Sequence, residues 1–232
     1  MKLLKLSNKE PLKPIILGLS EDEQYYCLVK NEAQKFHTFW HKKSEGETAI
    51  QQIIEKETEN KHFALVCPIP YQYIWRKTVF ISKKLDDIQL HRQIIQILKN
   101  EQPLAIECIN FDYQRLPSSN NNLDKIIIYA LNRRYAESLA QFNSILDCEL
   151  HCYIRAIFYL NPQLDNNSPC FYFKQKIIQF TENELIFPQV EPKDCISLSD
   201  IPITNIDIPS DNAKQLYCLA LGASLWNGKA LI

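Results

Sequence analysis

One uninterrupted apolar run constrains the fold of this chain more than any other feature. After Lys125, residues 126–131 are continuously apolar, with no alternation between polar and apolar positions. A strand of this kind is typical of a sheet that is covered on both faces. The run therefore predicts a layered protein in which helices pack against a sheet.

The order of the remaining elements predicts a mixed sheet. Three strands open the chain, followed by a helix and a strand, an inserted strand–helix–strand unit, and a final strand, helix and strand. Such a β-rich start followed by βαβ units suits a mixed sheet with helices on its faces. The expected strands are 15–19, 25–30, 34–40, 62–67, 73–81, 105–113, 125–131 and 149–154, and the expected helices follow Gly46 and span 86–100, 133–146 and 155–160.

The inserted unit carries clear local signals. Alternation over 73–81 indicates a strand. Asp86 is a good N-cap residue with Gln89 at the capping-box position, so a helix is expected to start there. Pro103 ends that helix, and a strand over 105–113 follows.

After Asn161 the pattern changes to short strands separated by tight polar turns. We expect strands at 170–173, 176–180 and 184–187. A proline-rich, loop-like stretch covers 191–209, and a closing helix is expected over 211–226.

The charge balance and the apolar pattern exclude several classes of protein. A net charge of −1 gives no general attraction to nucleic acid or to anionic membranes, so direct nucleic-acid binding is not expected. No apolar run reaches the length of a membrane-spanning helix, and the first seven residues are too short and too polar for a signal peptide. We therefore expect a cytosolic protein. In that compartment the eight cysteines are expected to be small buried apolar residues rather than a disulfide framework.

Two groups of residues have the composition of metal sites. Cys148, His151 and Cys152 are closely spaced, but the strand expected over 149–154 places the two cysteines on one face and the histidine on the other. His37 and His41 have the spacing that chelates zinc on a helix, yet the glutamates of zinc hydrolases are missing. We expect packed or surface roles for these residues, and no metal.

The remaining candidates for catalysis are equally isolated. Cys67, Cys148 or Cys152 could serve as nucleophiles beside a histidine, but nothing in the sequence indicates a lowered thiol pKa. Glu107 and Asp112 could act as acid and base, although the central strand carries no acidic residue to accompany them. The sequence therefore predicts no catalytic residue and no cofactor.

Four stretches occur in a characteristic order: 62–70, a strand ending in proline; 73–103, a strand, acidic cap and helix; 107–113, ending in Asp-Tyr; and 125–160, a strand–helix–strand–helix run. In this order and spacing they resemble the PilM family of pilus assembly proteins, which includes ComA and HofM. The resemblance implies an actin-like (RNase H-like) α/β fold with a mixed sheet. It also implies a first domain over 1–160 with an inserted subdomain at about 71–113, and a strongly reduced second domain over 161–232.

The chain departs from this family at the loop that holds nucleotide phosphates. Alignment on the first two strands places Ser20 where the family has aspartate and Asp22 where it has glycine. A carboxylate at that point repels a phosphate. Only four glycines are present in the whole chain, although phosphate loops commonly need them. We therefore expect no bound nucleotide.

The resemblance implies an adaptor rather than an enzyme, in type IV pilus assembly or in competence and DNA uptake. Its implied partner is the cytosolic N-terminal tail of a bitopic inner-membrane protein, PilN or a ComB-like counterpart, which would hold the adaptor at the membrane face. Candidate partner-binding residues are Trp75, Arg76, Phe111 and Tyr113, since aromatic residues and arginine often anchor contacts. Packing inside the insert is the alternative role for each. An actin-like ATPase or small kinase, and an interaction domain outside any pilus system, are the alternative functions.

Overall fold

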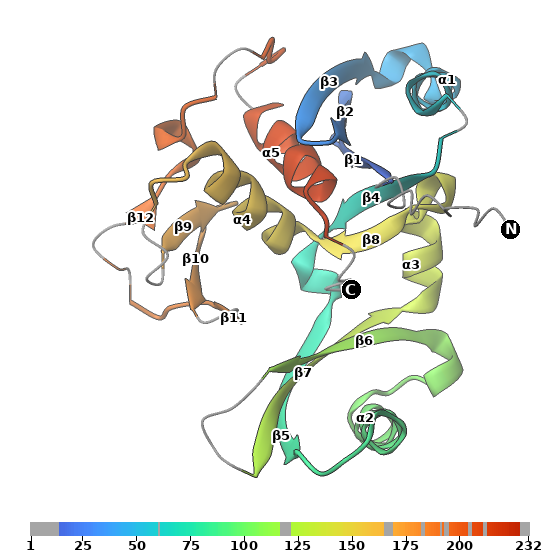
Figure 1. Ribbon diagram of the computed structural model, residues 1–232, viewed down its shortest axis with the longest axis vertical. Coiled ribbons are helices and arrows are strands. Elements are labelled where there is room, and N and C mark those ends of the chain that lie inside the picture. The colour runs from blue at the N-terminus through green and yellow to red at the C-terminus, as the bar shows by residue number, and fades with distance from the viewer. Residues whose placement is uncertain are drawn as a thin grey trace, which may run out of the picture.

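A computed structural model describes residues 14–59, 61–116, 122–164, 169–181, 184–190, 192, 195–203, 206–210 and 213–227. In this part of the chain, three sheets and five α-helices form a branched arrangement around the strand β8, Ile145–Cys148, and the helix α4, Glu149–Leu160 (Figure 1). The architecture is mixed α/β, as the sequence predicted.

The largest sheet has five strands in the order β3-β2-β1-β4-β8. Its first three strands form an antiparallel meander, whereas β4 and β8 run parallel to β1. These strands are β1, Ile15–Glu21, β2, Tyr25–Glu32, β3, Lys35–Lys42, and β4, Phe63–Ile69. Apolar residues alternate along β1 and β2, so each face of the sheet supplies its own core.

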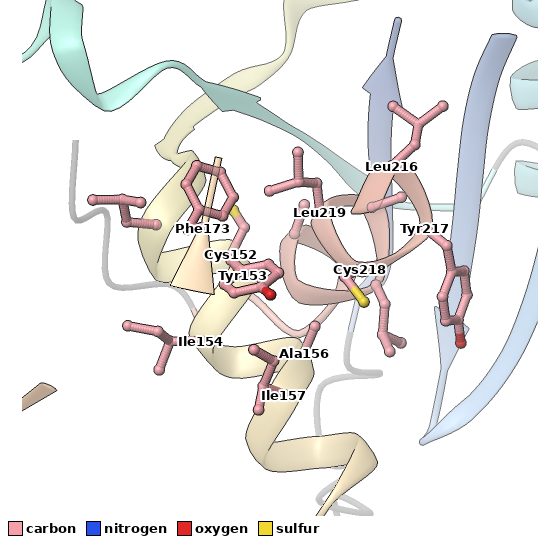
Figure 2. Packing of buried hydrophobic residues seen from close by; sticks show 14 of the residues in the cluster. Cys152, Tyr153, Ile154, Ala156, Ile157, Phe173, Leu216, Tyr217, Cys218 and Leu219 are labelled. Atoms are coloured by element: carbon pink, nitrogen blue, oxygen red, sulfur yellow. The ribbon is translucent and has the colours of Figure 1, made fainter. Parts of the chain in front are cut away.

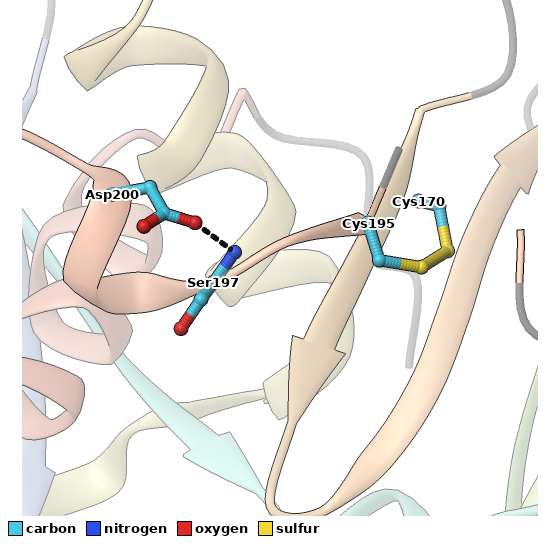
Figure 3. Close-up of a disulfide and its surroundings, with 4 residues drawn as sticks. All are labelled: Cys170, Cys195, Ser197 and Asp200. Atoms are coloured by element: carbon cyan, nitrogen blue, oxygen red, sulfur yellow. Dashed lines mark hydrogen bonds between the residues drawn. A yellow bond between two sulfur atoms is a disulfide. The ribbon is translucent and has the colours of Figure 1, made fainter. Parts of the chain in front are cut away.

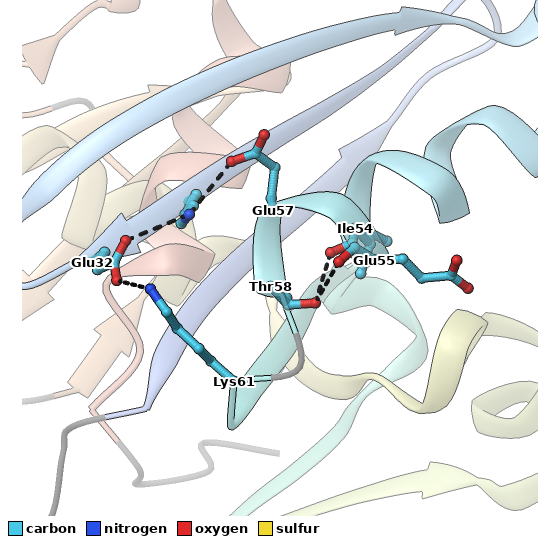
Figure 4. A network of polar contacts seen from close by, with 7 residues as sticks. Glu32, Ile54, Glu55, Glu57, Thr58 and Lys61 are labelled. Atoms are coloured by element: carbon cyan, nitrogen blue, oxygen red, sulfur yellow. Dashed lines mark hydrogen bonds and ion pairs between the residues drawn. The ribbon is translucent and has the colours of Figure 1, made fainter.

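Helix α1, Glu47–Thr58, covers one face of this sheet through Ile50 and Ile54. Its last turn is closed by the Thr58 hydroxyl, which donates to the carbonyl of Ile54 at 2.9 Å. Beside it, Lys30 of β2 lies 3.4 Å from Glu57, and Lys61 lies 2.9 Å from Glu32 (Figure 4). These ion pairs join β2 to the end of α1 and to Lys61 after it. The buried isoleucines contribute most of the stability of the packing between α1 and the sheet.

Helices α4 and α5, Ala213–Ser224, pack on the opposite face and form the largest apolar cluster. Figure 2 shows Cys152, Tyr153 and Ala156 of α4 facing Cys218 and Leu219 of α5. The two helices touch at Gly222, where an added Cβ atom would lie 1.7 Å from the carbonyl oxygen of Cys152. Only a glycine permits so close a crossing.

A separate three-stranded sheet has the order β5-β7-β6 and is covered on one face by α2. The strands are β5, Trp75–Ser82, β6, Ile109–Leu116, and β7, Leu123–Asn132, and the helix is α2, Asp87–Glu101. Asp86 caps α2 in a capping box with Gln89, as predicted. The apolar run 126–131 lies in β7, the middle strand of this small sheet. The inserted unit therefore includes β7 and extends to Asn132, whereas the sequence led us to expect its end at Tyr113.

The third sheet has the order β11-β10-β9-β12. Its strands are β9, Cys170–Phe173, β10, Lys176–Thr181, β11, Glu184–Ile186, and β12, Cys195–Ile196. Cys170 and Cys195 form a disulfide between β9 and β12 (Figure 3). The expectation of reduced cysteines is therefore wrong for this pair. The two strands are parallel neighbours in which these residues are register partners, and their separation of 25 positions hides that pairing in the sequence.

The segment between 133 and 160 also differs from its prediction. The expected helix 133–146 ends early, since α3 spans Arg133–Leu139 and the backbone takes positive φ angles of 55° at Phe142 and 56° at Asn143 before β8 begins. The strand expected over 149–154 is the start of α4. All six residues 149–154 are buried, so alternation of polar and apolar residues could not distinguish a strand from a helix here. The better signal was the helical spacing of the apolar residues Leu150, Tyr153, Ile154 and Ile157.

None of the helices in the described part of the chain combines the length and the apolar character that crossing a lipid bilayer requires.

Candidate functional site

An apolar groove of about 390 Å³ opens between the small sheet and the five-stranded sheet. Buried Leu131 and Ala136 and partly buried Leu146 form its floor, where they belong to one apolar cluster. The walls come from β6, α3 and β8, namely Asn110, Phe111, Asp112, Glu137, Ala140, Ser144 and Ile145. A groove with an apolar floor and a few polar groups at its rim is suited to binding part of another molecule.

Local sequence explains why these walls face one another. Strand β7 passes directly into α3 at Asn132, whose side chain accepts a hydrogen bond from the backbone N–H of Arg134 at 2.9 Å. That cap starts the helix immediately beside the sheet edge. The left-handed turn at Phe142 and Asn143 then returns the chain to β8. The groove is thus enclosed by one continuous stretch of chain and by β6.

Of the four partner-binding residues predicted from sequence, Phe111 lines this groove. Its ring stacks on His91 of α2, with the ring centroids 5.4 Å apart. Trp75 and Tyr113 share the face of the sheet on which Phe111 lies, and they pack against the cluster that α2 forms with the strands. The three aromatic residues therefore belong to one face, with Phe111 nearest to the groove.

Arg76 lies on the opposite face of the small sheet. Its Nη1 atom donates to the backbone carbonyl of Leu185 in β11. The arginine thus connects the small sheet to the third sheet, and the structure does not bring it together with the three aromatic residues. The partner-binding role of all four residues stays a prediction.

A second, smaller cavity of about 210 Å³ lies beside Ser20, one of the two positions that the sequence aligned with the phosphate loop of the PilM family. Ser20, Glu21, Glu149 and Lys174 contribute to its lining. The Ser20 hydroxyl donates to the carbonyl of Leu216 at 2.6 Å. Lys174 and the buried Glu149 form an ion pair at 2.7 Å. The main polar groups of the cavity are therefore engaged within the protein.

Asp22 occupies the turn between β1 and β2. Its Oδ1 atom accepts hydrogen bonds from the backbone N–H groups of Gln24 and Tyr25, both at 2.7 Å. Adjacent backbone N–H groups at a turn can hold an anion. A carboxylate of the chain itself thus takes the place of an incoming anion.

The cysteines and histidines considered as ligands or nucleophiles are kept apart or buried. Burial raises the pKa of Cys148 to about 12 and the pKa of Cys67 to about 11, and it raises that of Cys152 well above its usual value. Protonated thiols are poor nucleophiles and poor metal ligands. The described residues contain no group of three or more His, Cys, Asp or Glu side chains placed to hold a metal ion. The absence of a metal in the protein stays a prediction.

His37 and His41 lie in β3, where four residues span ~13 Å. That separation is too long for two ligands of one zinc ion. The side chain of His41 is buried, and it contacts the carbonyl of Gly46 at 3.2 Å and the carboxylate of Glu45 at 3.1 Å. It therefore contributes to the corner between β3 and α1.

Sequence reasoning missed most of the groove. Leu131, Ala136 and Leu146 were assigned to strand and helix interiors, and their meeting depends on how two sheets are placed. Asp112 was considered as an acid or base; in the structure it lines the groove, and its Oδ1 atom accepts a hydrogen bond from the N–H of Tyr113 at 2.8 Å. Glu107 is exposed in the short helix before β6. A useful signal was the polar cap residue Asn132 directly after a buried strand, which places a helix at the sheet edge.

The comparisons with known proteins show a fold. No protein-family profile matches the sequence, and no curated protein matches it. Among solved structures, a chain of the "PilM-PilN type IV pilus biogenesis complex" matches with a TM-score of 0.51 and 12% sequence identity. The match covers 74% of this chain and 59% of that chain. The fold is therefore PilM-like, and the chain spans less than two thirds of its structural neighbour.

Proposed function

We propose that this protein is a non-catalytic adaptor of a pilus-type assembly or DNA-uptake machine. In this proposal it binds the cytosolic N-terminal tail of a PilN-like or ComB-like inner-membrane protein, and this contact holds it at the inner face of the membrane. The single observation that carries the proposal is the apolar groove between β6, α3 and β8 in a PilM-like fold. A shortened, ComA-like form of the family is part of the proposal.

The groove fits an extended peptide better than a compact ligand. It follows the strands β6 and β8 and is lined by both. An extended peptide gains affinity from backbone hydrogen bonds and specificity from a few side chains that enter pockets. Phe111 is the wall that such a side chain would meet. Trp75 and Tyr113 would support that wall through the cluster with α2, and Arg76 would fix the sheet from its other face.

A peptide titration tests this proposal. A synthetic peptide of the N-terminal tail of a bitopic membrane protein encoded beside this gene is titrated into the purified protein without nucleotide. We expect binding in the micromolar range. Phe111→Ala should weaken binding about thirtyfold, which corresponds to about 2 kcal/mol.

Phe80→Ala is the matched control, because Phe80 lies in the same small sheet, is 60% exposed and does not line the groove. This variant should bind the peptide like the wild type. Both variants must retain cooperative unfolding. The proposal is wrong if the folded wild-type protein binds no such peptide and cells lacking the gene still assemble pili or take up DNA normally.

The alternative function is an actin-like ATPase or small kinase. Its place would be the cavity beside Ser20 and Lys174. A nucleotide titration separates the two functions, since an adaptor of this kind needs no nucleotide to bind its peptide.

A further inference from the structure

Two strand edges face each other across the groove. Strand β6 is last in the order β5-β7-β6, and β8 is last in the order β3-β2-β1-β4-β8, so each has one edge without a partner strand among the described residues. Three consecutive residues of β6, 110–112, line the groove, as do the first two residues of β8, Ile145 and Leu146, with Ser144 just before them. Because side chains alternate along a strand, a groove that touches three in a row runs along the edge of the strand.

The backbone groups of β6 indicate which atoms point into the groove. The N–H of Ile109 donates to the carbonyl of Ile106, and the N–H of Tyr113 donates to Asp112 Oδ1 at 2.8 Å. Both donors therefore point away from β7. Backbone direction alternates along a strand, so Phe111, midway between them, directs its N–H and C=O to the same side. An added strand could pair with Phe111 at this edge.

The charged side chains among the residues that line the groove are of one sign. Asp112 and Glu137 both line the groove, and no ion pair joins either carboxylate to another described residue. The guanidinium of Arg133 is directed to Asn110 instead, with its Nε 3.2 Å from Oδ1. The floor below them is apolar. The groove thus combines an edge for backbone pairing, an apolar floor and an acidic rim.

We infer that the groove selects a cationic, extended segment: one that pairs with the free edge of β6 at Phe111, places an apolar side chain over Leu131, and holds a cation beside Asp112 and Glu137. The cation is an ammonium or guanidinium group, from a lysine or arginine side chain or from the free α-amino group of the tail. This inference rests on the proposed function, because it assigns the specificity of the same groove.

A random octapeptide library displayed on beads tests the selection. The library is prepared in two forms, with free and with acetylated N-termini, and is probed with the labelled full-length protein. The second probe is the double variant Asp112→Asn/Glu137→Gln, which keeps the size of both side chains and the Asp112 acceptor for Tyr113 N–H. A control variant, Asp87→Asn/Glu23→Gln, removes the same charge from exposed positions outside the groove.

We expect lysine and arginine to be enriched beside a branched apolar residue, roughly fivefold for the wild type and for the control variant. The enrichment should fall to less than about twofold for the Asp112→Asn/Glu137→Gln variant. If the α-amino group supplies the cation, basic side chains will be enriched in the acetylated library alone. If a side chain supplies it, both libraries will show the enrichment, and either pattern supports the inference.

A salt titration keeps the test valid even if the double variant fails to fold. A selected peptide and its Lys→Gln copy are compared on the wild type, where we expect about a tenfold difference in Kd at low salt that shrinks as ionic strength rises. Selected peptides without a basic preference, or a preference unchanged in the double variant, would overturn the charge selection and leave the proposed function standing. Failure of every peptide to bind would overturn both.

Discussion

At the residue scale, the position of α5 depends on two glycines that meet backbone rather than side chains. A Cβ atom at Gly18 would lie 1.9 Å from the carbonyl oxygen of Ala220, and one at Gly222 would lie 1.7 Å from that of Cys152. Backbone atoms cannot rotate aside as the end of a flexible side chain can. These two close backbone contacts therefore determine how near the closing helix α5 lies to β1 and to α4.

We expect Gly222→Ala to lower the free energy of unfolding by about 3 kcal/mol. The gain in helix propensity, about 1 kcal/mol, is too small to offset the clash with α4. Gly46→Ala is the control, since nothing lies within 4 Å of its Cβ position and only its φ of 92° is strained. Its cost should be roughly 1–2 kcal/mol. Urea unfolding checks both values, and equal stability of Gly222→Ala and wild type would contradict the crossing.

The buried thiols differ in their neighbours, and this difference can be measured. Cys152 Sγ lies 3.7 Å from Asp147 Oδ2, whereas Cys218 is buried among apolar residues. We expect Cys218→Ser to cost about 1–3 kcal/mol, because its hydroxyl is placed in an apolar site. Cys152→Ser should cost less, about 1 kcal/mol or below, because its hydroxyl can donate to Asp147. Chemical denaturation gives the ranking.

The same variants test the prediction that Cys148 and Cys152 hold no metal. Protein purified without added metal should contain no stoichiometric zinc by atomic emission. Zinc found in the wild type and lost in Cys148→Ser/Cys152→Ser would contradict the assignment of these thiols to packing.

At the element scale, the start of α2 provides a matched pair of aspartates. Asp86 accepts the N–H of Gln89 at 2.8 Å, whereas the adjacent Asp87 side chain is 93% exposed. Asp86→Ala should therefore lower the free energy of unfolding by about 1 kcal/mol, and Asp87→Ala by only a few tenths. Thermal or urea unfolding measures both, and a cost for Asp87→Ala that equals or exceeds that for Asp86→Ala would argue against the cap.

Elements with their own local signals were predictable from the sequence. The capping box, the alternation in β5 and the short strands β9 to β11 were found where they were expected. The helix α4 was not, because its first residues are buried all round and contain no polar face for comparison. The pairing of Cys170 with Cys195 depends on a parallel contact between two short strands, which no local pattern encodes.

At the scale of the whole molecule, the groove is a product of how two sheets are placed. Phe111 was predicted as a contact residue because of its type, but the floor residues Leu131 and Leu146 come from strands of different sheets. Each of them also has the pattern of an ordinary core residue. The floor of the groove therefore follows from the way the two sheets are placed and cannot be deduced from any single segment of the sequence.

The same arrangement predicts that the isolated protein does not bind ATP usefully. At the turn after β1, Asp22 already occupies the backbone donors of Gln24 and Tyr25. In the cavity beside Ser20, Lys174 is paired with Glu149, and the Ser20 hydroxyl is directed to a backbone carbonyl. A triphosphate would have to break these contacts and then lie beside two carboxylates, Glu21 and Glu149.

Calorimetric titration with ATP and magnesium should therefore be flat into the millimolar range, which corresponds to a binding free energy of about −4 kcal/mol or weaker. Asp22→Gly is the informative variant, because it removes the carboxylate and frees both N–H groups of the turn. Since the Lys174–Glu149 pair remains in that variant, we expect it to stay without measurable binding as well. Micromolar ATP binding by the wild type would contradict the adaptor assignment and favour the ATPase or kinase. Binding by Asp22→Gly alone would show that the turn, rather than the ion pair across the cavity, excludes the nucleotide.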